Sequence, residues 1–177
     1  MKLTHAAIAA AFAAVAGVAS ADDQNINVTF VPDPDSTTNF SAGWGITHQA
    51  AGAFTDTITF TDGVSGTFAS SLVTVGFMDQ TNIDFTSVSV NGQSYTLGAT
   101  GPIETPYFEP SVVGGPLVLT VTGIAAPALT AGTAISASYA GTANVTAVPE
   151  PESYALMLAG LGVVGLLARR RRAEGRH

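Results

Sequence analysis

Cysteine is absent from this 177-residue chain, and Lys and Arg are confined to its two ends. The six basic residues are Lys2, Arg169–Arg172 and Arg176, whereas the cation-free span from Thr4 to Ala168 holds twelve Asp and Glu. Without cysteine no disulfide can stabilise the fold, which must therefore depend on an apolar core. Without Lys or Arg the central region cannot neutralise phosphates, which excludes binding to DNA, RNA or nucleotides.

Histidine is almost as rare in the central region. His48 is the only histidine between residues 22 and 147, and no Gly-x-Ser-x-Gly sequence occurs. A hydrolase needs a nucleophile, a base and an orienting acid within hydrogen-bond reach, so this composition disfavours an enzyme. A zinc site is disfavoured for the same reason, because zinc prefers several His or Cys ligands. We expect His48 at a strand edge or in a loop, in a non-enzymatic protein with no catalytic residues.

Residues 1–21 have the pattern of a secretory signal peptide. Lys2 precedes an apolar run from Ala6 to Val18, and Ala19-Ser20-Ala21 follows. Small residues at Ala19 and Ala21 predict cleavage before Asp22, after export by a Sec-type machinery. The alternative, a first transmembrane helix, is disfavoured because the run is short and acidic residues follow it directly.

Residues 22–147 are long enough to form one domain with its own core. Apolar residues alternate there with polar ones, which is the period of a β-strand, and no helical period occurs. In the run from Phe54 to Thr61 this alternation places Phe54, Asp56 and Ile58 on one face. Asn91-Gly92 separates two further runs and predicts a hairpin with a type I′ turn. The patterns predict an all-β fold, an antiparallel β-sandwich of about seven to nine strands, with jelly-roll or Ig-like topology left open.

Asp56 is unusual because it lies on the apolar face of its strand. The domain contains no Lys or Arg that could pair with its carboxylate. A buried carboxylate must be hydrogen-bonded or paired. One interpretation is that Asp56 accepts bonds from backbone N–H or Ser and Thr hydroxyl groups at a strand end or turn. The other is a structural calcium ion, bound together with Asp62, Asp33 and Asp35, because calcium prefers several oxygen ligands. No other cofactor is expected.

A few aromatic residues lie next to Gly and Pro, as is typical of loops. Trp44 stands between two glycines, and Tyr107 and Phe108 lie in a proline-rich segment over residues 105–110. Aromatic rings exposed on such loops could stack on sugars, so a carbohydrate-binding module acting on matrix polysaccharide is an alternative function. The same rings could instead pack in the core or against loops.

The C-terminal segment, residues 148–172, has three features in a fixed order: Pro149-Glu150-Pro151, an apolar run over 154–168, and Arg169–Arg172. A helix over 153–168 would be about 24 Å long, just short of the ~30 Å hydrocarbon core. The arginines would keep residues 173–177 cytoplasmic. This pattern predicts a short transmembrane helix, preceded by a stiff, extended proline segment.

This order of features resembles the PEP-CTERM sorting signal of Gram-negative bacteria, which the membrane enzyme exosortase recognises and cuts. The resemblance implies that Pro149, Glu150 and Pro151 are the processing signature and that Arg169, Arg170, Arg171 and Arg172 are the membrane stop. It further implies passage through the inner membrane to the cell surface or extracellular matrix, in association with exopolysaccharide or biofilm. A plain single-pass tail anchor is the alternative.

The stretch from His48 to Thr61 also resembles the signature of the FxDxF family of PEP-CTERM proteins. Phe54 and Asp56 match the motif, and Ile58 stands where the family has its second Phe. This resemblance implies an architecture and an export route, and it carries no established biochemical activity.

Overall fold

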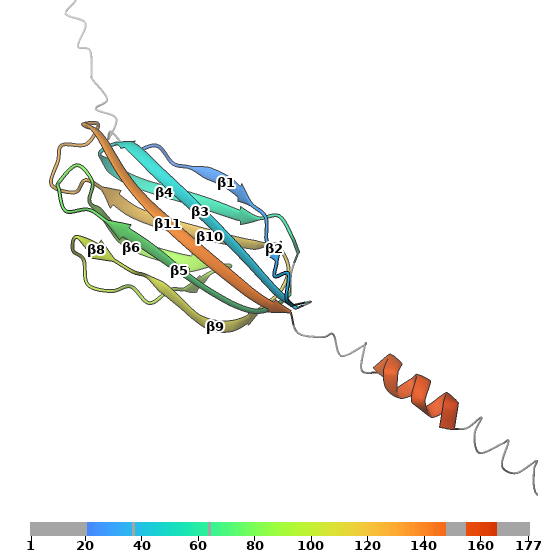
Figure 1. The fold of residues 1–177 in the computed structure, drawn as a ribbon. Helices are drawn as coiled ribbons and strands as arrows, with labels where there is room; N and C mark the ends of the chain where they lie inside the picture. The colour runs from blue at the N-terminus through green and yellow to red at the C-terminus, as the bar shows by residue number, and fades with distance from the viewer. Residues whose placement is uncertain (1–20, 37, 64, 148–154, 166–177) are drawn as a thin grey trace, which may run out of the picture.

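The computed structural model describes residues 21–36, 38–63, 65–147 and 155–165. Up to residue 147 these residues form two facing β-sheets (Figure 1). The strands are β1 (Asn25–Val28), β2 (Val31–Pro32), β3 (Asn39–Ala50), β4 (Gly52–Phe60), β5 (Gly66–Val75), β6 (Ile83–Val90), β7 (Gln93–Ser94), β8 (Ile103–Glu104), β9 (Tyr107–Val113), β10 (Leu117–Ala125) and β11 (Ala134–Ala147). The predicted all-β sandwich is therefore confirmed.

One sheet has the strand order β1-β4-β10-β6-β7, and the other has the order β2-β3-β11-β5-β8, with β9 also paired to β5. The prediction of a wholly antiparallel sandwich is wrong at one edge. There β1 runs parallel to β4, with Ile26 opposite Ile58. Alternation within a strand sets which side chains face inward but not the direction of the neighbouring strand, so sequence alone could not reveal this pairing.

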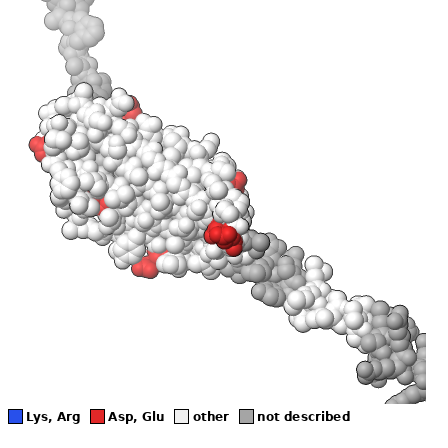
Figure 2. Space-filling model, viewed as in Figure 1, with Lys and Arg blue, Asp and Glu red and all other residues white. Residues whose placement is uncertain are grey.

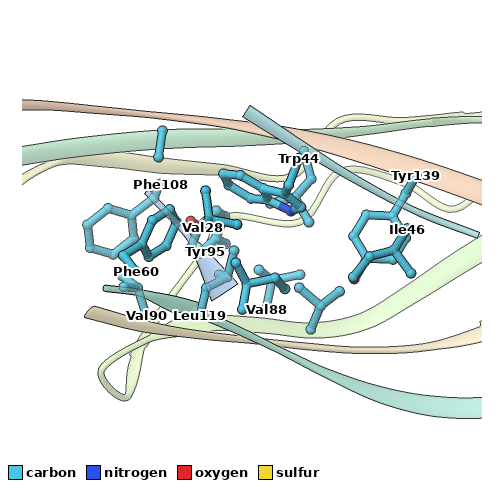
Figure 3. Packing of buried hydrophobic residues seen from close by; sticks show 14 of the residues in the cluster. Val28, Trp44, Ile46, Phe60, Val88, Val90, Tyr95, Phe108, Leu119 and Tyr139 are labelled. Carbon is cyan, nitrogen blue, oxygen red and sulfur yellow. The ribbon is translucent and has the colours of Figure 1, made fainter. Parts of the chain in front are cut away.

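The core lies between the sheets and is built by the predicted alternation. In β4 the inward residues Phe54, Asp56, Ile58 and Phe60 are buried, while the threonines between them face outward. Phe60 packs edge-to-face against Trp44 of β3, with ring centroids 5.5 Å apart, so it bridges the two sheets (Figure 3). Aromatic packing of this kind replaces the missing disulfides as the link between the layers.

The predicted hairpin at Asn91-Gly92 is confirmed. Both residues have positive φ, 47° and 81°, and they join β6 to β7 with Val90 opposite Gln93. Asn and Gly tolerate this left-handed conformation better than other residues.

Strand β3 and strand β9 were not expected. Trp44 was predicted to lie in a loop that could display its ring, and this is wrong, because Trp44 lies within β3 with only 9% of its surface exposed. The residues flanking Trp44 are glycines on the outward face, where side chains are not needed for packing. From Tyr107 onward the proline-rich segment likewise belongs to a strand, β9, which tolerates Pro110 in an edge position.

Gly141 of β11 lies directly opposite Trp44 and leaves room for its ring. A Cβ atom added to Gly141 would collide with the indole, whereas one added to the nearby Gly43 would come no closer than 3.9 Å to any atom. We therefore expect Gly141→Ala to lower the free energy of unfolding by about 1–3 kcal/mol through overpacking, and Gly43→Ala to change it little. Urea unfolding followed by circular dichroism measures both, and equal effects would contradict this account of Trp44 packing.

A helix spans residues 155–165 of the C-terminal segment, within the predicted helix over 154–168. Residues 154 and 166–168 lie outside the described residues. Eleven helical residues are about 16 Å long. Among the described residues, no helix is both long and apolar enough to cross a membrane.

Candidate functional site

A group of hydrogen-bonded polar side chains is buried around Asp56. One carboxylate oxygen, Oδ1, accepts the backbone N–H of Gln24 at 2.7 Å. The other, Oδ2, accepts the Tyr139 hydroxyl at 2.7 Å and lies 3.0 Å from Nε2 of His48. His48 and Asp56 are completely buried, and Tyr139 is 2% exposed. The two sheets thus meet through one carboxylate with three donors.

The elements around Asp56 place these donors by register. Asp56 lies in β4, while His48 and Tyr139 come from the facing strands β3 and β11. The His48 ring stacks on Phe54, with centroids 4.1 Å apart, so neighbouring aromatic packing fixes its orientation. Because an ionised carboxylate only accepts hydrogen bonds, the proton of His48 is assigned to Nε2. The second ring nitrogen, Nδ1, has no partner among the described residues.

The structure corrects two expectations at this site. His48 was expected at a strand edge or in a loop, but its ring points into the core from within β3. Asp56 was expected to accept Ser or Thr hydroxyls at a strand end or turn, and it instead binds Tyr139 and His48 from the middle of β4. The expected backbone N–H donor is present, from Gln24. The signal that sequence reasoning missed is the alternation Ala42, Trp44, Ile46, His48, which marks His48 as inward-facing.

The ligand set predicted for calcium is not assembled. Asp62 accepts the backbone N–H of Phe30, and Asp33 accepts that of Asp35 within a turn. In the ranges that the structure describes, no three His, Cys, Asp or Glu side chains lie where they could hold a metal ion together. The buried carboxylate of Asp56 is instead stabilised by the hydrogen bonds that it accepts from protein donors.

Burial limits what this cluster can do chemically. A His, an Asp and a Tyr hydroxyl are a combination that could move protons, but each of the three is closed off from solvent. A catalytic group must reach its substrate. The hydrogen bonds of Asp56 to His48 and Tyr139 join the two sheets.

Two buried tyrosines make the sandwich sensitive to alkali. Burial raises the pKa of Tyr95 to about 12, and burial together with the neighbouring Asp56 charge raises the pKa of Tyr139 further. A raised folded-state pKa contributes stability that is complete below the unfolded value of about 10 and is lost as pH rises through the folded value.

We therefore expect the free energy of unfolding to fall as pH rises from about 10 to 12, by up to about 1.4 kcal/mol per pH unit for each buried tyrosine. Denaturant unfolding at a series of pH values measures this fall. Tyr95→Phe should make the fall less steep. A free energy that stays constant over this range would contradict the burial of both hydroxyls.

Glu104 is a buried acid that sequence reasoning missed. It lies in β8 with 4% of its surface exposed, and its carboxylate accepts the backbone N–H groups of Phe85 at 3.0 Å and Gly101 at 3.2 Å. Burial, opposed by these two bonds and reinforced by the nearby Asp84, raises the pKa of Glu104. A single acid in a two-residue strand leaves no period in the sequence, so no pattern could have indicated it.

The aromatic residues predicted to contact a ligand differ in exposure. Trp44 and Phe108 are buried at 9% and 6% exposure, whereas Tyr107 is 44% exposed at the start of β9. The predicted signature residues Phe54 and Ile58 are core residues on the Asp56 face, as expected. Of the signal-cleavage pair, Ala19 lies outside the described residues and Ala21 is buried.

The processing residues Pro149, Glu150 and Pro151 and the arginines Arg169–Arg172 lie outside the described residues. The fold and the C-terminal segment together define the class: a cysteine-free β-sandwich domain followed by a short apolar helix. Residues 147–172 match the PEP-CTERM protein-sorting motif. The predicted sorting signal is therefore confirmed, and this match supports the conclusion that the chain is exported and sorted by exosortase. No curated protein and no solved structure matched the chain. Membership of the FxDxF family stays a prediction.

Proposed function

We propose that this chain is a non-enzymatic structural protein that exosortase delivers to the cell surface or extracellular matrix, where it associates with exopolysaccharide. The sorting motif over residues 147–172 is the observation that carries this proposal. In this proposal a Sec-type machinery exports the chain. The apolar run over 154–168 then holds it in the inner membrane only until exosortase acts at Pro149-Glu150-Pro151.

The composition of the outer surface supports a neutral, hydrated partner. The described residues contain no Lys or Arg, and Figure 2 shows only isolated acidic residues on the face it presents. Such a surface offers no cations for binding phosphate groups or anionic lipid.

The outward face of the sheet β1-β4-β10-β6 carries hydroxyl and amide groups in register. Asn25 lies opposite Thr57, Thr57 opposite Thr120, and Thr120 opposite Ser89, so one row crosses four strands. Hydroxyl and amide groups both donate and accept hydrogen bonds, as sugar hydroxyls do. This row therefore suits a polysaccharide that lies flat on the sheet.

Thr57→Val together with Thr120→Val tests the row, because valine keeps the β-branched shape and removes only the hydroxyls. We expect the wild-type protein to co-sediment saturably with exopolysaccharide extracted from its native host. The double variant should bind about tenfold more weakly, which corresponds to about 1.4 kcal/mol for two hydrogen bonds. Thr142→Val, on the outer face of the other sheet, is the matched control. Unchanged binding by the double variant would reject this face, and no binding by wild type would reject the polysaccharide partner.

A carbohydrate-binding module that stacks sugars on aromatic rings is the second candidate. The observation that favours it is the exposed ring of Tyr107. If stacking dominates, Tyr107→Ala should abolish co-sedimentation while the threonine double variant still binds.

A further inference from the structure

The alignment of the chain with β4 begins upstream of β1, at Ala21. Ala21 is 2% exposed and belongs to the hydrophobic core. Its backbone N–H donates to the carbonyl of Ala53 at 3.0 Å. Ala21 and Ala53 are separated by 32 positions, the same offset that pairs Asn25 with Thr57. Ala21 is thus in register with β4 and is an integral part of the domain.

The residues that follow depend on this alignment. Asp23 accepts the backbone N–H of Thr55 at 2.7 Å, and the backbone N–H of Gln24 binds the buried Asp56. A cut between Ala21 and Asp22 would remove a core side chain and the donor of the bond to Ala53.

The sequence contains two bonds that fit the small-residue rule for signal cleavage. Ala19 and Ala21 are small at the −3 and −1 positions of the bond before Asp22. Gly17 and Ala19 are small at the same positions of the bond before Ser20. The rule itself does not choose between these bonds.

We propose that signal peptidase hydrolyses the Ala19–Ser20 bond, two residues upstream of the site predicted from sequence. Water adds across this peptide bond, leaving a carboxylate on Ala19 and a new α-amino group on Ser20. The mature chain then keeps Ala21 in the core and places its charged terminus two residues before Asp22. This inference rests on the proposed export of the chain, and the two can fail separately.

N-terminal sequencing and intact mass of the full-length gene product, expressed with its own signal peptide in a Gram-negative host, provide the first test. A chain that begins at Ser20 supports the proposal. A chain that begins at Asp22 overturns it while leaving export intact. A chain that still begins at Met1 overturns the export on which it rests.

Two matched variants separate the bonds without depending on folding, because the N-terminus is read in denatured whole-cell extract. Ala21→Leu places a large residue at −1 of the downstream bond and outside the small positions of the Ala19–Ser20 bond. Gly17→Leu places a large residue at −3 of the Ala19–Ser20 bond only. We expect Ala21→Leu to be processed like wild type and Gly17→Leu to accumulate as precursor. The reverse pattern, or equal processing of both variants at Asp22, would overturn the proposal.

Discussion

Asp56→Ala should lower the free energy of unfolding by about 3–5 kcal/mol, because it leaves three buried or partly buried donors without an acceptor. The donors are the fully buried Tyr139 hydroxyl and Nε2–H group of His48 and the partly buried backbone N–H of Gln24. Typical domains are stable by about 5–15 kcal/mol, so this loss would bring the protein near global unfolding at ordinary temperature. Denaturant unfolding of the full chain followed by circular dichroism measures it.

Asp23→Ala is the matched control for this substitution. Asp23 also accepts one backbone N–H, from Thr55, but it does so at the exposed edge of the same strand pair. We expect a much smaller loss of stability, because water can replace the missing acceptor there. Similar losses for both aspartates would show that the burial of Asp56 is not what makes it important.

Tyr139→Phe provides a further test, because its effect on the free energy of unfolding should have opposite signs in the wild type and in the Asp56→Ala variant. In wild type it removes a donor from the buried carboxylate and should destabilise the domain. In the Asp56→Ala background the hydroxyl no longer has its carboxylate acceptor, so removing it should restore part of the lost stability. Additive effects of the two substitutions would indicate that Tyr139 and Asp56 do not act as a pair.

Replacing Pro149-Glu150-Pro151 by three alanines should abolish exosortase processing while leaving insertion of the chain unchanged. The motif match covers these residues, and the apolar run and the arginines that follow are untouched. Full-length protein should therefore accumulate in the inner-membrane fraction. Quantifying the protein in membrane, periplasmic and extracellular fractions, in hosts with and without exosortase, measures this effect.

Replacing Arg169–Arg172 by alanine is the matched change, and it should fail in a different way. The arginines are expected to stop translocation, so without them the C-terminal segment should pass through the membrane and the protein should escape unsorted. If the Pro-Glu-Pro variant is cut and released like wild type, exosortase does not read that signature. If both variants accumulate in the inner membrane, the arginines are not a membrane stop.

The sequence by itself determined the class of fold and the sorting signal. Period-two alternation is a local property, so the inward faces of Phe54, Asp56 and Ile58 could be predicted from one strand alone. Asn91-Gly92 has a turn preference that is equally local. The C-terminal motif needs no fold for its recognition, because the order of prolines, apolar run and arginines is contained in the linear chain.

Only the tertiary structure showed which side chains from different strands are in contact. Asp56 needs donors, but the sequence could not show that they come from residues 8 and 83 positions away, because strand pairing between sheets is not encoded in the period. Trp44 looked like a loop residue because its glycine neighbours are outward-facing, and β11 covers it through Gly141. Ala21 was predicted to end a signal peptide, and that prediction stays open, but only the structure could show that Ala21 is buried in the core and bonded to Ala53. Small residues suit both a signal-cleavage site and a tightly packed strand, so the sequence does not separate the two roles.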